Sequence, residues 1–336
     1  MRNSQKSKDY VFASAHVRSV EKNLLTREGL DKMIDSRTPG DALKILYDLG
    51  YGDGSEMVQD EKFGELLSQE IKKAYSFIQG IVPDQEDLNV FLYPYDYHNL
   101  KVCMKAEFLG IQPEEYLIDV GTINTSNLVV MVRERNFLGM TVRMKDALLE
   151  VVDVFSRTQD PQVIDFIFDK ACYAEMVESA ARSGNRYIQG YVSLLIDTIN
   201  LKTFVRLRQM KKTWDVFSQV FLEGGRISEK LFISGYDEPY EQFAEKLTPF
   251  ELNEVLSEGG AMIREQGRFT ALERLCDNQI MKYAKSAKYV SFGIEPLAGY
   301  LIAKEGEIRT VRIVMTGLLQ GLSREMIQER VRETYV

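Results

Sequence analysis

The sequence predicts an all-α fold built from three similar helical units. Only 8 of the 336 residues are proline, and Leu, Glu, Lys, Arg and Met are frequent, a composition that favours helices over a turn-rich β-sandwich. A polar segment that opens a helix-like run occurs twice and, in weaker form, a third time, about a hundred residues apart, and such a period usually decides an architecture. No stretch shows the alternating apolar pattern of paired strands. We therefore expect units at residues 1–120, 121–225 and 226–336.

Start signals, stop signals and apolar residues at helical spacing define the helices of the first unit. Thr26 and Thr38 are expected to cap two of them, and Pro94 is expected to separate or kink the longest run, because proline removes a helical hydrogen bond. The expected helices are residues 10–25, a short helix after Thr26, residues 39–49, 60–81, 84–93 and 95–109, and a short helix from Pro113 down to Gly121.

The second and third units repeat this plan. Thr125, Thr141 and Ser323 are expected N-caps. Glycine lowers helix propensity, so Gly299 and Gly306 are expected to break or loosen the last long helix. The expected helices are residues 160–182, 186–212, 214–221, a helix that starts at Thr248-Pro249, residues 268–284, 295–319, and one from Ser323 to the C-terminus.

The repeated segment is Asp-x-x-Asn-Leu-Lys, which begins at Asp96 and again at Asp197. Its Asp and Asn share one helical face, so they are either metal ligands or groups that bond to neighbouring helix ends inside each unit. Neither copy brings a third ligand at helical spacing, and the third copy has Lys304 and Glu307 instead. We therefore expect a structural role that marks the register of the repeat. The residues with this expected role are Asp96, Asn99, Asp197, Asn200 and Glu307.

A pair of basic residues accompanies each copy of the segment. Like charges at this helical spacing cost a few tenths of a kcal/mol on an isolated helix. Their recurrence indicates either an acidic partner, inside the unit or on another protein, or a solvated face. The candidate interface residues are Lys101, Lys105, Lys202, Arg206, Arg309 and Arg312.

Few other patterns indicate chemistry. Asp165 and Asp169, one helical turn apart, have the spacing of a magnesium site in an all-α enzyme. No Asp-Asp-x-x-Asp run supports that alternative, and Glu273 and Asp277 reproduce the spacing in the third unit. There is no phosphate-binding loop of the G-x-x-x-x-G-K-[ST] form. His16 stands apart from any candidate nucleophile, as does the second histidine, His98. We expect no catalytic residue, metal site or cofactor.

Charge and cysteine usage bound the partners and the compartment. The net charge is −8, with both signs interspersed, which argues against nucleic acid as the main partner. Cys103, Cys172 and Cys276 lie far apart without metal-site spacing and suit a reducing compartment. The N-terminal residues lack the apolar stretch of a signal peptide, and the longest apolar runs fall short of the roughly 20 residues of a membrane helix. We expect a cytoplasmic protein that touches a membrane only through partners.

Over nearly its whole length the chain resembles the C subunit of bacterial and archaeal V/A-type rotary ATPases, whose eukaryotic relative is the d subunit of the vacuolar ATPase. The order of the motifs and the threefold repeat together carry the resemblance. The matching stretches are Ala15-His16-Val17-Arg18 with Leu24-Leu25, the two Asp-x-x-Asn-Leu-Lys copies, Glu295-Pro296-Leu297-Ala298-Gly299-Tyr300-x-x-x-Lys304-Glu305-x-Glu307-Ile308-Arg309-x-x-Arg312, and Gly321-Leu322-Ser323-Arg324-Glu325-x-Ile327-x-x-Arg330.

The resemblance implies a funnel of three helical units in a pseudo-threefold arrangement. It also implies a non-catalytic place in the central stalk, between the membrane rotor ring and the shaft made by the D and F subunits, in a complex that transports sodium or protons. We add the hypothesis that the six basic residues line a socket for the shaft. The alternatives are a magnesium-dependent enzyme that uses Asp165 and Asp169, and a free-standing helical scaffold.

Overall fold

The computed structural model describes residues 10–52 and 59–336, and these residues form helices joined by loops, with no strand among them. The prediction of an all-α fold is confirmed. Contacts divide the chain into two compact units. The middle unit comprises residues 84–200 and 209–229, and the terminal unit comprises residues 1–83, 201–208 and 230–336. The boundaries of the three repeated units stay a prediction.

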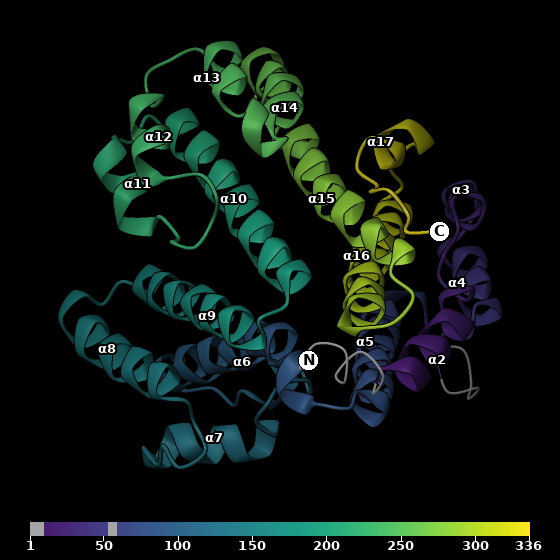
Figure 1. The fold of residues 1–336 in the computed structure, drawn as a ribbon, viewed down its shortest axis with the longest axis horizontal. Coiled ribbons are helices and arrows are strands. Elements are labelled where there is room, and N and C mark those ends of the chain that lie inside the picture. Colours follow the sequence, from purple (N-terminus) through teal and green to yellow (C-terminus); the bar gives the residue numbers. More distant parts are fainter. Residues whose placement is uncertain (1–9, 53–58) are drawn as a thin grey trace. The chain divides into compact units, whose positions relative to one another are not determined.

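The middle unit is organised around α9 (Gln162–Ser183), which packs against α6 (Asn89–Leu109) and α8 (Val142–Thr158) (Figure 1). Buried residues of α9 recur at helical spacing, as at Phe168 and Cys172, so one face of the helix is apolar. The Phe168 ring meets the Tyr97 ring of α6 edge-on, with centroids 6.2 Å apart. The unit also contains α7 (Thr125–Glu134), α11 (Trp214–Val220), the 3₁₀ turns Gln85–Leu88 and Glu114–Tyr116, and the first part of α10 (Arg186–Gln209).

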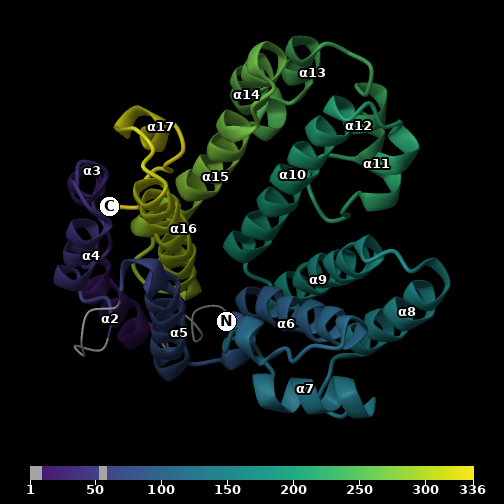
Figure 2. The ribbon, with the colours of Figure 1, turned by 180° about the vertical axis from the view of Figure 1, so that it is seen from behind.

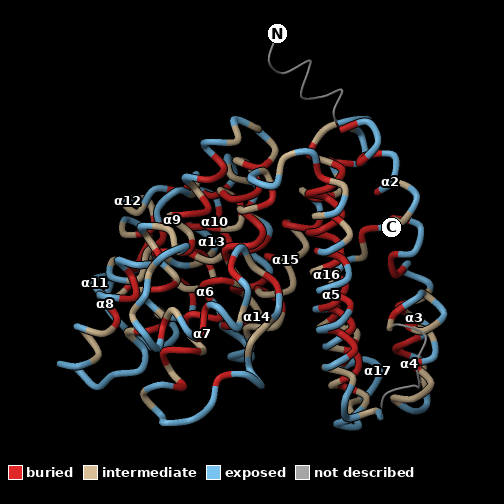
Figure 3. The backbone as a smooth tube through the Cα atoms, turned by 90° about the horizontal axis from the view of Figure 1, so that it is seen from below, coloured by how far each residue is buried: buried red, intermediate tan, exposed pale blue. Residues whose placement is uncertain are grey.

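The terminal unit is organised around α16 (Ile294–Leu319), which contacts α2 (Val11–Glu21), α5 (Phe63–Ile81) and α15 (Thr270–Lys285) (Figure 2). Neighbours on several sides explain why buried residues run along α16 with little regard to helical face, as Figure 3 shows. The unit also contains α3 (Arg27–Ile34), α4 (Pro39–Asp48), α13 (Tyr240–Lys246), α14 (Asn253–Gln266), α17 (Arg324–Gln328), almost all of α12 (Glu229–Ser234), and the 3₁₀ turns Asp60–Lys62, Thr248–Phe250 and Ser286–Tyr289.

Four of the expected caps form, whereas the helix expected to start at Thr248-Pro249 is only the 3₁₀ turn Thr248–Phe250, without a side-chain cap. The hydroxyls of Thr26, Thr38, Thr141 and Ser323 each accept a hydrogen bond from a backbone N–H in the first turn of the helix that follows. The prediction for Thr125 is wrong, because Asn124 caps α7 by accepting from the Ser126 N–H and Thr125 is the first helical residue. The Asn side chain satisfies this end of the helix one residue earlier.

The expected separation at Pro94 is wrong, since α6 runs through it from Asn89 to Leu109. Buried side chains lie on both sides of the proline, among them Leu92, Tyr93 and Tyr97. Their packing offsets the backbone hydrogen bond that proline cannot make. The short helix expected to run down to Gly121 is only the 3₁₀ turn Glu114–Tyr116, because the next residues bond to side chains of α6.

The expected break of α16 at its glycines is also wrong. A Cβ on Gly299 would lie 2.6 Å from the Ala287 Cβ, and one on Gly306 would lie 2.6 Å from the Met281 Cε, so these glycines let α16 approach its neighbours closely. The helix expected to run from Ser323 to the C-terminus ends at Gln328. The chain beyond it is held by side chains of the terminal unit, as where the Lys288 ammonium donates to the Tyr335 carbonyl at 2.6 Å.

Candidate functional site

The first copy of the repeated segment holds a loop of the middle unit to α6. The Asn99 side chain donates from Nδ2 to the Ile118 carbonyl at 2.8 Å and accepts the Ile118 N–H at Oδ1 at 2.9 Å. One turn earlier, the Asp96 carboxylate accepts the Thr122 N–H at 3.0 Å, the Thr122 hydroxyl at 2.7 Å and the Ile123 N–H at 3.2 Å. We call this arrangement the motif–loop contact. It leaves neither side chain free to bind an ion.

The second copy repeats the motif–loop contact on α10. The Asn200 side chain exchanges two hydrogen bonds with Leu222, donating from Nδ2 to the carbonyl at 2.8 Å and accepting the N–H at 3.0 Å. The Asp197 carboxylate accepts the Ile227 N–H at 3.0 Å and forms an ion pair with Arg226 at 3.0 Å. The same residue types therefore hold the same type of loop in both copies.

A glycine beside each aspartate makes this approach possible. A Cβ at Gly121 would lie 2.3 Å from the Asp96 Oδ1, and a Cβ at Gly225 would lie 2.3 Å from the Asp197 Oδ1. Gly121 also has a φ of 147°, which disfavours other residues. In the sequence Gly121-Thr-Ile resembles Gly225-Arg-Ile, and the structure supplies the steric reason for this likeness.

The third copy holds the loop that follows α2. The Glu307 carboxylate accepts the Leu25 N–H at 2.5 Å and the Tyr51 hydroxyl at 2.5 Å, and it pairs with Lys304 at 2.8 Å. Lys304 also pairs with Glu70 at 3.0 Å. Burial lowers the pKa of Lys304, but the charges of Glu307 and Glu70 outweigh burial and raise it overall. Glutamate and lysine thus replace Asn and Asp, and the loop comes from the start of the chain.

Burial shifts the pKa of the two aspartates of the motif. It raises the pKa of Asp96 to about 6, against the opposing effect of the donors from Thr122 and Ile123. It also raises the pKa of Asp197, whose partners Ile227 and Arg226 act in the lowering direction. A buried carboxylate is tolerated at each position because backbone N–H groups satisfy it.

Acidic partners for the basic pairs lie inside the same compact unit. In the middle unit Lys101 of α6 pairs with Asp169 of α9 at 2.5 Å, and Lys105 pairs with Asp165 at 2.7 Å. The two carboxylates considered for magnesium are therefore each neutralised by a lysine. Within residues 10–52 and 59–336, no group of three or more His, Cys, Asp or Glu side chains is placed to hold a metal ion.

The terminal unit has a related but uneven arrangement. Lys202 of α10 lies 3.8 Å from Asp277 of α15, and Arg206 lies 3.1 Å from Glu273. Arg309 of α16 reaches the same Asp277 at 3.5 Å. Arg312, one turn further along α16, is exposed. The candidate basic residues therefore differ in how completely their charge is compensated.

A family model described as ATP synthase (C/AC39) subunit matches residues 13–330. The chain belongs to this family. It is similar to the C subunit of the V-type sodium ATPase of Enterococcus hirae, with 24% identity over 95% of the chain and 97% of the relative. It is also similar to the C subunits of two A-type ATP synthases, from Methanocaldococcus jannaschii, 23% identical over 95% and 85% of the two chains, and from Methanococcoides burtonii, 22% identical over 98% and 96%. The resemblance found in the sequence is confirmed.

Membership in the C/AC39 family makes the chain a structural subunit of a V/A-type ATP synthase complex and not its catalytic subunit. A magnesium-dependent enzyme using Asp165 and Asp169 is not supported, because both carboxylates are engaged by lysines. No helix in the described part of this C/AC39 chain is long and apolar enough to cross a membrane.

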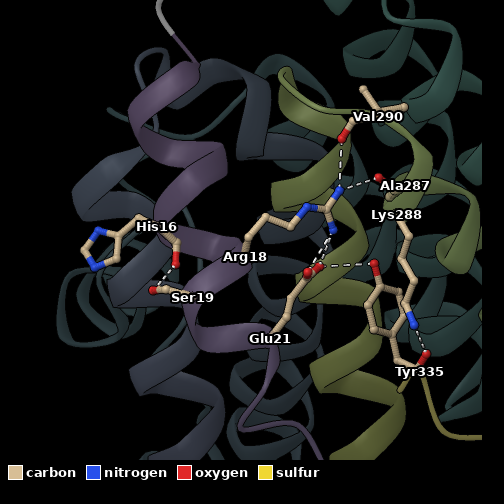
Figure 4. A network of polar contacts seen from close by, with 8 residues as sticks. All are labelled: His16, Arg18, Ser19, Glu21, Ala287, Lys288, Val290 and Tyr335. Atoms are coloured by element: carbon tan, nitrogen blue, oxygen red, sulfur yellow. Dashed lines mark hydrogen bonds and ion pairs between the residues drawn. The ribbon is translucent and has the colours of Figure 1, made fainter.

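One polar network of this C/AC39 chain was not predicted. Arg18 of α2 donates to the carbonyls of Ala287 at 2.7 Å and Val290 at 2.9 Å and pairs with Glu21 at 2.8 Å, while the Tyr335 hydroxyl donates to Glu21 at 3.2 Å (Figure 4). The network joins α2 to Tyr335, near the C-terminus. Its one signal in the sequence was Arg18, which stands in a stretch that carried the family resemblance.

Proposed function

We propose that the chain is a non-catalytic central-stalk subunit that couples the D/F shaft of a V/A-type rotary ATPase to its membrane rotor ring. The observation that carries this proposal is the motif–loop contact, repeated in a chain of the C/AC39 family. Each contact fixes a loop to a long helix by hydrogen bonds of 2.5–2.8 Å that are buried or partly buried. A coupling that transmits torque needs this stiffness more than it needs a pocket.

Three helical units around a socket would receive the tip of the shaft, and the opposite end would rest on polar loops of the ring. The proposed socket lining is the basic side chains of α10 and α16, namely Lys202, Arg206, Arg309 and Arg312, because Lys101 and Lys105 are already paired with Asp169 and Asp165. Because three units face a ring with a different number of subunits, their contacts cannot pair one to one. Such an interface is modest and sensitive to salt, which allows the soluble motor to come off reversibly.

Deletion of the gene tests the proposal in native membranes. Without this chain, the soluble ATPase head should leave the membrane sector, and ATP hydrolysis should continue without ion pumping. Adding the purified chain back should restore both attachment and pumping. Coupled pumping in membranes that lack the chain would refute the proposal, and so would a fully attached head.

The remaining alternative is a free-standing helical scaffold, which differs only in its partners. Purification of the tagged chain from gently solubilised membranes separates the two ideas. Recovery of shaft and ring subunits in fixed proportion supports the stalk, whereas their consistent absence supports a scaffold.

A further inference from the structure

One carboxylate on α15 lies close to more positively charged side chains than it can neutralise. Asp277 lies 2.9 Å from Arg332, 3.5 Å from Arg309 and 3.8 Å from Lys202. These cations come from the C-terminal segment, α16 and α10, all within the terminal unit. The Asp277 side chain is only 10% exposed, so bulk water contributes little to screening this carboxylate.

The neighbouring positions add to the imbalance. Glu273, one turn before Asp277 on α15, is already paired with Arg206. Arg312 follows Arg309 by one turn on α16, and no ion pair of Arg312 is found within the part of the chain that the structure describes. We call these residues the α15 basic cluster. It comprises five cations and two carboxylates, namely Lys202, Arg206, Arg309, Arg312 and Arg332 with Glu273 and Asp277.

The corresponding residues of the middle unit are balanced. Lys101 and Lys105 of α6 each have their own carboxylate on α9, at 2.5 Å and 2.7 Å. The six basic residues selected from the sequence are therefore not equivalent. Surplus positive charge gathers where α10, α16 and the C-terminal segment meet α15, and none remains in the quartet of α6 and α9.

The surplus cations are accessible to another molecule. The side chain of Arg206 is 58% exposed and that of Arg309 is 51% exposed. A guanidinium group offers several N–H donors in one plane and binds carboxylates in a bidentate manner. The ion pair of Arg309 with Asp277, at 3.5 Å, involves one nitrogen of the guanidinium group and leaves other donors for a partner.

We propose that the α15 basic cluster binds an acidic segment of a partner protein, with Arg309 and Arg312 as its main contacts. The carboxylates of the partner's segment would supply the negative charge that α15 lacks. The cations lie along one turn of α15, from Glu273 to Asp277, and come from separate elements, which fits a row of acidic side chains better than one small anion. The inference rests on the proposed function, in which this partner is the shaft, and it makes one side of the socket dominant.

Binding of a peptide probe by the purified full-length chain tests this inference. The probe is a fluorescein-labelled, glutamate-rich peptide, and the readout is fluorescence anisotropy at low salt. The double variant R309Q/R312Q should bind about tenfold more weakly or worse, since two charge-assisted contacts are lost. The matched variant K101Q/K105Q, which removes two lysines from the balanced quartet, should bind within about twofold of the original chain.

A third variant should act in the opposite direction. D277N removes the carboxylate that competes with the peptide for Arg309, so the variant should bind the probe several-fold more tightly, in the range of one charged contact. Thermal unfolding by circular dichroism identifies any variant that fails to fold. A misfolded R309Q/R312Q would be replaced by the milder single variant R312Q, whose side chain has no ion pair to lose in the described residues.

Three outcomes would overturn the inference. They are unchanged binding by R309Q/R312Q, an equal loss in K101Q/K105Q, and displacement of the peptide by inorganic phosphate at the same total charge, which would mean a general anion site. The proposed function is judged separately in membranes. If R309Q/R312Q restores coupled pumping to deletion membranes as well as the original chain does, the cluster is not the shaft contact, although the stalk function stands.

Discussion

At the scale of single residues, two glycines decide whether the motif–loop contacts can form. Gly225 and Gly121 are adjacent to carboxylates that need close approach to the loop backbone, and a side chain would occupy the same space. Neither glycine has an obvious role from the sequence alone, because each follows an ordinary loop. Each glycine is required because it leaves room for the carboxylate of an aspartate about 25 to 30 residues earlier in the chain.

Substituting Gly225 by alanine should therefore destabilise the protein. The new Cβ would lie 2.3 Å from the Asp197 Oδ1 and 3.2 Å from the Ile196 Cγ2. We expect a loss of about 1–3 kcal/mol in the free energy of unfolding, measured with urea. Gly80 of α5 has nothing within 4 Å of its Cβ position. The control G80A should match or exceed the original stability, and equal stabilities of G225A and G80A would contradict the steric argument.

Asp96 should make the stability depend on pH. Burial raises its pKa from 3.8 to about 6, so the folded state binds a proton that the unfolded state has already released. The contribution of Asp96 to the free energy of unfolding is fully present below about pH 4 and is lost as the pH rises through about 6. The total loss is about 2–3 kcal/mol.

Comparison with D96N isolates this group, because the amide does not titrate. The free energy of unfolding of the original chain, minus that of D96N, should fall between pH 4 and pH 6 in urea titrations and then level off. A difference that stays constant over this range, or rises, would show that Asp96 is ionised throughout.

At the scale of elements, packing overrides local helix signals. Proline and glycine predict breaks in α6 and α16, yet both helices are continuous because buried neighbours surround them. The same competition shortens other elements. In the loop after α6, backbone N–H groups bond to the side chains of Asn99 and Asp96 instead of to helical carbonyls. The C-terminal segment is held by the ion pair of Arg332 with Asp277 and by the hydrogen bond from Lys288 to the Tyr335 carbonyl.

The junction of α16 with the first loop depends on Lys304. This lysine is 5% exposed and lies between the carboxylates of Glu70 and Glu307. K304M would leave two buried carboxylates without a cation, so we expect a loss of about 3–5 kcal/mol in the free energy of unfolding.

The variant K105M is the matched control for K304M. It removes a lysine from the pair with Asp165, in which both side chains are about 40% exposed. Its cost should stay below about 1 kcal/mol, because water screens an exposed ion pair. Similar losses in the two variants would mean that Lys304 does not compensate its neighbours as described.

At the scale of the whole molecule, the central-stalk proposal predicts a salt-sensitive attachment. Binding of the purified chain to membranes stripped of the ATPase head should weaken steadily as NaCl rises from about 50 mM to about 0.5 M, because charged contacts at the surface are screened. Sedimentation of the membranes followed by immunoblotting measures the bound fraction. A bound fraction that does not change with salt would contradict a polar contact between the chain and the ring.

The sequence by itself determined the fold class, the family and the residues of the motif–loop contacts. These features depend on periodicity and on repeated short patterns, which survive in a linear chain. It left open whether the basic pairs meet acidic partners or form a solvated face. It located few of the short helices in the region proposed as the third repeat, where α12 and α13 have only 6 and 7 residues and therefore no long apolar period.

Only the tertiary structure decided what these residues contact. Glu307 and Leu25 are separated by most of the chain, as are Arg18 and Val290, and no local pattern relates them. The structure also distinguished Lys101 and Lys105, which are neutralised one to one, from Arg309, which shares Asp277 with two other cations. Charge can be counted from a sequence, but its balance depends on distances between side chains, and folding sets those distances.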